Sequence, residues 1–254
     1  MLSAIQTMDL HYTYPDGTPA LKGFSCQIQK GECVGIVGPS GAGKSTLALC
    51  LSGLVLPQKG TILIGDQKLD RKNLKQLRSK VGLIFQNPDD QLFMPSLFDD
   101  VAFGLVQQGT PLETVREKVE RNLLEMGLQG LENKFPGHLS GGQKRLASLA
   151  GVLVMEPEAL ILDEPSANLD PKARRTLIQR LARLQNTRII LSHDLEMILD
   201  LANRVILINQ GTAIAEGDPE KILGNAELMT ANNLEVPHSL LPHPDSHRRA
   251  HLKT

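Results

Sequence analysis

The 254-residue sequence predicts an α/β fold with a mostly parallel sheet, an antiparallel β part at the N-terminus and an inserted helical subdomain. Three observations support this prediction. Short apolar runs alternate with helical patterns in the second half of the chain, which is typical of a parallel sheet covered by helices. Residues 3–31 have the alternation of strands, with a hairpin turn at Asp16-Gly17. Residues 88–157 show helical spacing instead.

The first part of the chain is expected to combine the N-terminal hairpin with the first buried strand. Leu10, Tyr12 and Tyr14 share one face of the first extended segment. Residues 33–37 are apolar or glycine, which indicates a parallel strand buried on both faces. In chain order, the predicted elements are strands at residues 20–28 and 33–37, a helix at residues 46–51, and strands at residues 60–64 and 81–85.

The middle of the chain is expected to be helical, and the α/β alternation then returns. Within residues 112–126, one helix face carries apolar side chains at regular spacing, namely Val115, Val119, Leu123 and Met126. The other predicted helices of the middle block are residues 97–105 and one that Ser140 opens and that ends near Val154. The later predicted elements are strands at residues 159–162, 188–191 and 205–208 and helices at residues 171–184 and 195–202.

This pattern predicts a single domain at residues 1–224. Its core comprises residues 1–87 and 158–224, and its helical subdomain comprises residues 88–157. Beyond Gly224 the periodicity dissolves, so residues 225–254 are assigned to a C-terminal extension, whose tail from Pro237 is expected to be mobile. This extension carries four histidines, His238, His243, His247 and His251. Because their spacing is irregular, a solvated tail is preferred to a metal-handling one.

The composition excludes several classes of protein. A formal net charge of -1, aromatic residues at 3% and the absence of Trp give no support for nucleic-acid binding. Cys26, Cys33 and Cys50 fit neither a zinc site nor a disulfide framework, which favours buried thiols in a reducing compartment. The sequence shows no signal peptide and no apolar run of the ~20 residues that span a bilayer. We therefore expect a soluble or peripheral protein of the cytoplasm.

The sharpest motif is a phosphate-binding loop, because residues 38–45 fit the pattern G-x-x-x-x-G-K-S/T at every position. The glycines let backbone N–H groups surround phosphate oxygens. Lys44 supplies a positive charge for the β- and γ-phosphates, and the Ser45 hydroxyl is placed to hold Mg²⁺. The loop lies between a predicted strand and a helix N-terminus, so we expect the core of a P-loop NTPase that binds ATP. The predicted nucleotide contacts are Gly38, Pro39, Ser40, Gly41, Ala42, Gly43, Lys44, Ser45 and Thr46.

A second motif places two carboxylates after an apolar strand, at Asp163 and Glu164. In a doubly wound sheet, ligands bind beyond the carboxyl ends of the strands. Asp163 is therefore predicted to complete the Mg²⁺ site opposite Ser45. Glu164 is predicted to polarise the water that attacks the γ-phosphate.

The third motif, Leu139-Ser140-Gly141-Gly142-Gln143, is a second potential anion site at a helix start. With it, the chain resembles the ATP-binding cassette (ABC) ATPases, whose signature is LSGGQ. The resemblance extends from Tyr14 to about Gly217, and its motifs follow the family order. It implies that two subunits bind nucleotide head to tail, each signature facing the partner's phosphate loop. The signature residues acting in trans would be Ser140, Gly141, Gly142 and Gln143.

The same resemblance implies further roles. Gln86 would contact Mg²⁺ and the attacking water and signal to a membrane partner, and His193 would hydrogen-bond the γ-phosphate. Tyr14 would stack on adenine, although core packing is the alternative for this side chain. Residues 166–170 would cross between the subunits, and Asn168 stands where commoner family versions carry Gly.

Two segments resemble the energy-coupling-factor and cobalt/nickel importer ATPases: residues 85–93 and residues 164–171. This resemblance implies a peripheral subunit at the cytoplasmic face of the cell membrane. Its partners would be a second ATPase subunit, identical or different, a transmembrane energy-coupling subunit and a separate substrate-binding membrane protein. Leu92, Phe93 and Met94 form an apolar cluster that suits docking to the membrane partner. Anchoring of the helical subdomain is the alternative for these three residues.

The function predicted from the sequence is therefore ATP hydrolysis that drives uptake, with nickel or cobalt as the leading cargo and a vitamin as the runner-up. A soluble ABC ATPase acting outside transport is a different class. Such proteins usually carry long coiled-coil insertions or two cassettes, and this chain has neither. A nucleotide-binding regulator without turnover is a third class, against which the presence of Glu164 and His193 argues.

Overall fold

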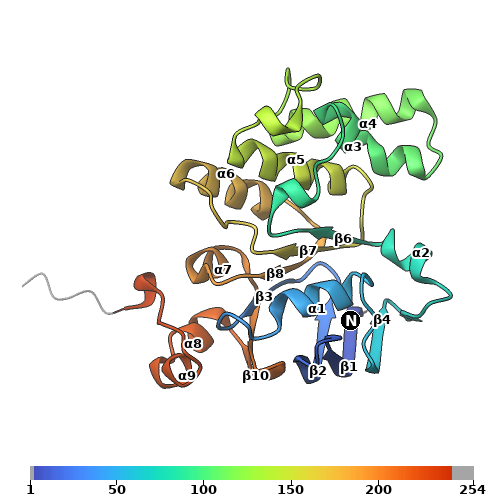
Figure 1. Ribbon diagram of the computed structural model, residues 1–254. Coiled ribbons are helices and arrows are strands. Elements are labelled where there is room, and N and C mark those ends of the chain that lie inside the picture. Colours follow the sequence, from blue (N-terminus) through green and yellow to red (C-terminus); the bar gives the residue numbers. More distant parts are fainter. Residues whose placement is uncertain (1–2, 242–254) are drawn as a thin grey trace, which may run out of the picture.

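The computed structural model describes residues 3–241 and has three layers: a block of helices, a central sheet and a second sheet at the opposite end (Figure 1). The central sheet has six strands in the order β10-β9-β3-β8-β7-β6, and only β10 runs antiparallel to its neighbour. Their bounds are β3 (Cys33–Val37), β6 (Val81–Ile84), β7 (Ala159–Asp163), β8 (Thr187–Leu191), β9 (Arg204–Asn209) and β10 (Thr212–Gly217). The predicted mostly parallel sheet is confirmed.

The parallel order explains where the motifs meet. All residues of β3, β7 and β8 are buried, as expected for central strands covered on both faces. Because β3, β6, β7 and β8 are parallel, their carboxyl ends lie at one edge of the sheet. The phosphate loop, Gln86, Glu164 and His193 follow these four strands and are therefore carried to the same edge.

The N-terminal sheet is antiparallel, as predicted, with the strand order β2-β1-β4-β5. Its strands are β1 (Ser3–Thr13), β2 (Pro19–Gln29), β4 (Lys59–Ile64) and β5 (Gln67–Lys68). Helix α1 (Lys44–Leu51) packs between this sheet and the central one, and all three contribute to one apolar cluster. The cluster includes Cys26 and Cys50, and all three cysteines are buried and free. This packing fixes the phosphate loop between the two sheets.

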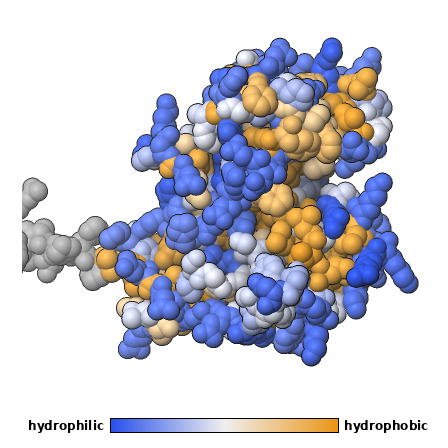
Figure 2. Space-filling view, viewed as in Figure 1, coloured by the Kyte–Doolittle hydropathy of each residue, from blue (hydrophilic) through white to orange (hydrophobic). Residues whose placement is uncertain are grey.

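The helical block consists of α3 (Leu97–Gln107), α4 (Leu112–Met126) and α5 (Gly141–Leu153). The predicted apolar face of α4 is buried at Val115, Val119, Leu123 and Met126. Helices α6 (Pro171–Ala182) and α7 (Leu195–Leu201) continue the cover on this side of the sheet (Figure 1). Apolar surface gathers where the block meets the rest of the molecule (Figure 2).

The structure differs from the sequence prediction in its shorter elements and beyond residue 224. Helices α2 (Leu74–Arg78) and α8 (Pro219–Leu223) and strands β5 and β10 had not been predicted. In the C-terminal extension, α9 (Ala226–Ala231) buries Met229. Within the tail expected to be mobile, a 3-10 turn, η3 (His238–Leu240), packs on the core. A helix this short makes fewer than two turns and leaves no readable periodicity. The other tail histidines, His243, His247 and His251, lie outside the described residues.

Within residues 3–241, no helix has the length and apolar character needed to cross a membrane.

Candidate nucleotide-binding site

The phosphate loop connects β3 to α1 and lines a cavity of about 460 Å³. Gly43 has φ +103°, and a Cβ built on it would lie 2.4 Å from the carbonyl oxygen of Ala20. Glycine is therefore required here both for the backbone conformation and for the close approach of β2. The loop is held against β2 at this position.

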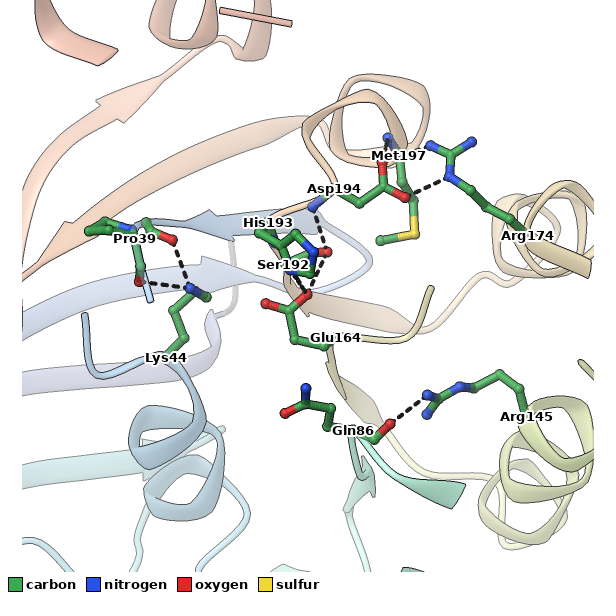
Figure 3. A network of polar contacts seen from close by, with 11 residues as sticks. Pro39, Lys44, Gln86, Arg145, Glu164, Arg174, Ser192, His193, Asp194 and Met197 are labelled. Atoms are coloured by element: carbon green, nitrogen blue, oxygen red, sulfur yellow. Dashed lines mark hydrogen bonds and ion pairs between the residues drawn. The ribbon is translucent and has the colours of Figure 1, made fainter. Parts of the chain in front are cut away.

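The loop holds the Lys44 ammonium in place through its own carbonyl groups. Its ammonium donates hydrogen bonds to the carbonyl oxygens of Gly38 (2.7 Å) and Pro39 (3.1 Å) (Figure 3). Burial lowers the pKa of Lys44, while the negative charges of Glu164 and Asp163 act in the opposite direction. The chain thus keeps a largely desolvated cation over the loop, where phosphate oxygens can replace the carbonyl groups as acceptors.

The cavity brings together five predicted parts of the site. Its lining includes residues 40–46 of the loop together with Tyr14, Gln86, Glu164 and His193. The Tyr14 hydroxyl lies 2.8 Å from the Thr46 hydroxyl, and the Tyr14 ring is half-buried. Tyr14 therefore lines the cavity wall and is not fully buried in the core.

Glu164 is held in a strained position at the end of β7. Its φ of +47° is unusual for a residue with a side chain and costs on the order of 1–3 kcal/mol. The carboxylate accepts hydrogen bonds from the Ser192 hydroxyl (3.1 Å) and the His193 backbone N–H (3.2 Å). The His193 ring places Nδ1 2.7 Å from the same carboxylate oxygen (Figure 3). Glu164 is almost fully buried, whereas 69% of the His193 side chain is exposed.

The residues predicted to hold Mg²⁺ lie together next to this cavity. Ser45, Gln86 and Asp163 share a second cavity of about 570 Å³. Asp163 is buried, and its Oδ1 has no hydrogen-bond partner. Burial raises the pKa of Asp163, against which a hydrogen bond from Ser45 acts. A cation would supply the missing partner, and hydroxyl, amide and carboxylate oxygens are the ligands that Mg²⁺ prefers, so the residues fit this ion.

The signature lies at the start of α5, where Ser140 and Gly141 are exposed and Gly142 and Gln143 are half-buried. Ser140 caps the helix through its hydroxyl, which accepts a hydrogen bond from the Gln143 backbone N–H, and the Gln143 side-chain oxygen accepts one from the Ser140 backbone N–H. Gly142 packs on α6, where an added Cβ would lie 2.7 Å from that of Ala173. Of the four signature residues, only Gly141 lines the second cavity, and none lines the first. The signature therefore stays outside the first cavity of its own chain, and Gly141 shares only the second cavity with Ser45 of the loop.

In the loop predicted to cross between subunits, Asn168 stands where the family commonly has glycine, and the backbone conformation at this position accepts asparagine. Asn168 has φ +60°. This left-handed conformation favours glycine, and asparagine is among the side chains that tolerate it best. The backbone conformation that glycine would supply is therefore present here with asparagine.

The predicted docking cluster divides between two environments. Leu92 packs against the core, as the anchoring alternative expects. Phe93 is 64% exposed and meets Phe103 edge to face at 5.0 Å. Leu92, Phe93 and Phe103 line a groove of about 230 Å³ between β6, α3 and α5. Met94 does not line this groove, and its backbone N–H donates to Asp100.

Several residues of the site could not be found from the motifs. Thr18, Pro19 and Ala20 line the nucleotide cavity because β2 begins beside the loop, and no local pattern marks them. Ser192 positions Glu164 only through the fold. Arg145 does carry a signal, because this arginine lies on the buried face of an apolar helix.

Comparison with known proteins agrees with this geometry. The family model described as "ABC transporter" matches residues 21–167. The energy-coupling factor transporter ATP-binding protein EcfA of Methanothermobacter thermautotrophicus is 45% identical over 238 residues, which cover 92% of this chain and 76% of that protein. The protein of the same name from Methanocaldococcus jannaschii is 43% identical, with coverage of 92% and 85%.

Solved structures share the fold over nearly the whole chain. The cbiO1 protein of Clostridium perfringens, part of the ABC transporter complex cbiONQ, superposes with a TM-score of 0.81 at 37% identity and covers 94% of this chain and 98% of its own. A dimeric ATP-binding cassette in a post-hydrolysis state, with ADP and phosphate bound, gives a TM-score of 0.77 at 28% identity and coverages of 85% and 98%. The chain therefore belongs to the ABC transporter family, among the energy-coupling factor ATP-binding proteins, and is an ATPase that couples ATP hydrolysis to transport.

Proposed function

We propose that this chain is the ATP-hydrolysing subunit of a nickel or cobalt importer and that it works as a dimer on a transmembrane partner at the cytoplasmic face of the membrane. The observation that carries the ATPase chemistry is the shared cavity of the phosphate loop, Gln86, Glu164 and His193. The assignment of the cargo rests on the resemblance of residues 85–93 and 164–171 to the ATPases of nickel and cobalt importers. A vitamin is the alternative cargo.

In the proposed mechanism, each side chain acts from the position described above. Lys44 exchanges its loop carbonyl partners for phosphate oxygens and thereby offsets their charge. Glu164, fixed by Ser192 and the His193 backbone, orients and polarises the attacking water. The His193 ring, which is largely exposed, is proposed to donate to the γ-phosphate. Ser45, Gln86 and Asp163 would hold Mg²⁺, which when bound neutralises charge on the phosphates.

The second half of the site is proposed to come from a partner subunit. Within one chain Ser140 and Gly141 are exposed, and none of the four signature residues lines the first cavity, which holds the phosphate loop. An exposed helix N-terminus with free N–H groups is suited to phosphate oxygens of a nucleotide held elsewhere. The dimeric relative with ADP and phosphate bound supports this arrangement.

The groove beside Phe93 is the proposed docking surface for the membrane partner. Its walls are apolar, and they contain three buried polar atoms without hydrogen-bond partners: Gln91 Oε1, Asp100 Oδ2 and Ser148 Oγ. Buried polar atoms left unpaired are costly, so the occupant is expected to supply donors as well as an apolar contact. A short helix with one basic side chain meets both requirements.

The cargo and the coupling are tested together in proteoliposomes that contain the assembled transporter. ATP-driven uptake of radioactive Ni²⁺ or Co²⁺ is expected, and Glu164→Gln should abolish it. Uptake of a vitamin without either metal would replace the proposed cargo and leave the ATPase assignment standing.

Docking is tested separately with Phe93→Asp. We expect normal ATP affinity of the isolated subunit and loss of its retention on membranes that contain the partner. Leu112→Asp is the control, because Leu112 is also exposed but lies outside this groove. Normal retention of the Phe93 variant, or loss of ATP binding together with folding, would return Phe93 to a structural role.

A further inference from the structure

Arg145 connects the signature helix to the segment that carries Gln86. It lies on α5, two residues after Gln143 of the signature, and is only 2% exposed. Its two terminal nitrogens donate to consecutive backbone carbonyl groups, Nη1 to Phe85 (2.6 Å) and Nη2 to Gln86 (2.6 Å). Figure 3 shows the guanidinium group facing the Gln86 carbonyl oxygen from α5. Because the guanidinium fork is rigid and planar, this contact fixes orientation as well as distance.

The preceding residue makes a second attachment to the same segment. The Lys144 ammonium lies 2.6 Å from Asp89 Oδ1, at the turn η1 (Pro88–Asp90) that follows Gln86. This pair is weaker, since 62% of the Asp89 side chain is exposed to solvent. Residues 85–90 are thus held at their start by a buried contact and at their end by a surface contact, both from α5.

The Arg145 contact is difficult to break because the side chain is a buried cation. Arginine stays protonated in proteins, so moving this charge away from both carbonyl groups is strongly unfavourable. A displacement of the Gln86 backbone must then either displace α5 or break this contact.

We propose that Arg145 is a positioning residue that makes the Gln86 segment and the signature helix move as one element. The Gln86 side chain lines the nucleotide cavity of its own chain, and α5 begins with the signature that the same chain presents outward. Binding of ATP in one site would then shift the signature offered to the second site. This relay rests on the proposed two-subunit arrangement, whereas the attachment itself lies within one chain.

A buried arginine elsewhere provides a matched control. Arg188 on β8 is 9% exposed, donates through Nη1 to the carbonyl oxygen of Leu181, and like Arg145 has an unpaired Nε. It lines neither of the two cavities. Arg188→Met therefore matches Arg145→Met, because each variant removes a buried positive charge that donates to a backbone carbonyl group. Arg188→Met, however, leaves the Gln86 segment attached to α5.

The test uses the full chain, a non-hydrolysable ATP analogue and backbone hydrogen exchange, at concentrations where sedimentation shows single chains. In the wild type and in Arg188→Met, the analogue should slow exchange in the phosphate loop, in residues 85–90 and in α5. In Arg145→Met, protection of the phosphate loop should persist and protection of α5 should disappear. In the assembled transporter, kcat should fall about tenfold or more while the ATP affinity of the isolated chain changes less than about threefold.

Arg145→Lys extends the test, because one ammonium group cannot reproduce the two-carbonyl fork. Partial α5 protection and an intermediate kcat are expected. If Arg145→Met does not fold, the decision rests on this variant, which must lose at least half of the α5 protection. The proposal is overturned if α5 protection and kcat in the Arg145 variants equal those of Arg188→Met. It is also overturned if the wild type protects the phosphate loop without α5, whereas absence of protection in the phosphate loop itself would contradict ATP binding.

Discussion

The two helix starts predicted to bind anions, at α1 and α5, differ in how many of the groups needed for ATP hydrolysis surround them. At α1, the phosphate loop is enclosed by two sheets, and Lys44 has acceptors for its charge within the loop. Glu164 and His193 reach the same cavity from other strands. At α5, the exposed signature satisfies only its own first turn through the Ser140–Gln143 capping box. The first region contains reacting groups, and the second offers backbone donors alone.

This difference indicates that the two regions have different roles in ATP hydrolysis. A site that must hold a triphosphate needs charge, burial and fixed carboxylates, and these come from a sheet whose strand ends meet. A site that only completes another molecule's nucleotide pocket needs a rigid, exposed helix start. Substitutions in the two regions should therefore have separable effects on chemistry, assembly and stability.

The largest expected effect lies in the first region, at Glu164. Glu164→Gln keeps the shape of the side chain but removes the carboxylate that polarises water, so ATP hydrolysis should slow by roughly 10²-fold or more while ATP still binds. Turnover is measured in the reconstituted complex, and ATP binding is measured on the isolated chain. Glu158→Gln is the control, because Glu158 is an exposed carboxylate in a surface ion pair with Lys80. Turnover near that of the wild type would remove Glu164 from the chemistry.

The next effect concerns whether the two regions serve the same ATP from opposite subunits. Lys44→Ala removes the phosphate-binding charge, and Ser140→Arg blocks the signature. In a homodimer, mixing the two inactive variants should restore activity, because each mixed pair contains one intact composite site. ATPase activity of the mixture is compared with that of each variant alone. An unchanged rate, with mixed dimers present and one site known to suffice, would contradict sites shared in trans.

A smaller effect separates the packing of the signature from its exposed donors. Gly142→Ala places a methyl group against Ala173 and should lower the free energy of unfolding by about 1–3 kcal/mol. Gly141→Ala, with no neighbouring atom within 4 Å, should leave it within about 0.5 kcal/mol. Urea unfolding of both variants and of Gly142→Ala with Ala173→Gly gives the comparison. If the double variant does not recover stability, the contact with α6 is not the cause.

The sequence predicts the first region better than the second. The phosphate loop, Asp163 and Glu164 are marked by residue types whose chemistry is local, and the strand periodicity places them at one edge of a parallel sheet. For the signature, composition indicates a capped helix start, but its exposure depends on packing against α6. Arg145 shows the limit most clearly. Its position on a buried helix face is visible in the sequence, whereas its two acceptors are backbone carbonyl groups on a segment about 60 residues earlier in the chain.

The part of the chain beyond Gly224 was predicted less well, for a related reason. Helix α9 and the turn η3 are too short for a periodic pattern, and their stability comes from contacts with α7 and the core. The Ser239 backbone and hydroxyl both donate to the Glu196 carboxylate, and hydrogen bonding from Ser239 lowers the pKa of that carboxylate. Such long-range contacts leave no pattern in the local sequence.

The smallest expected effect comes from removing the end of the chain in two lengths. Deleting residues 242–254 should leave ATPase activity and the melting temperature unchanged. Deleting residues 238–254 should also preserve ATPase activity, since none of the described residues 238–241 lines the nucleotide cavity. The longer deletion, however, removes the Ser239 contacts with Glu196 and the packing of Leu240, so the melting temperature should fall by roughly 2–4 °C. Both variants are measured by thermal unfolding, ATP hydrolysis and metal uptake. Loss of uptake in the shorter deletion, with ATPase activity intact, would instead assign a metal-handling role to the tail histidines and place a third functional region beyond the two compared above.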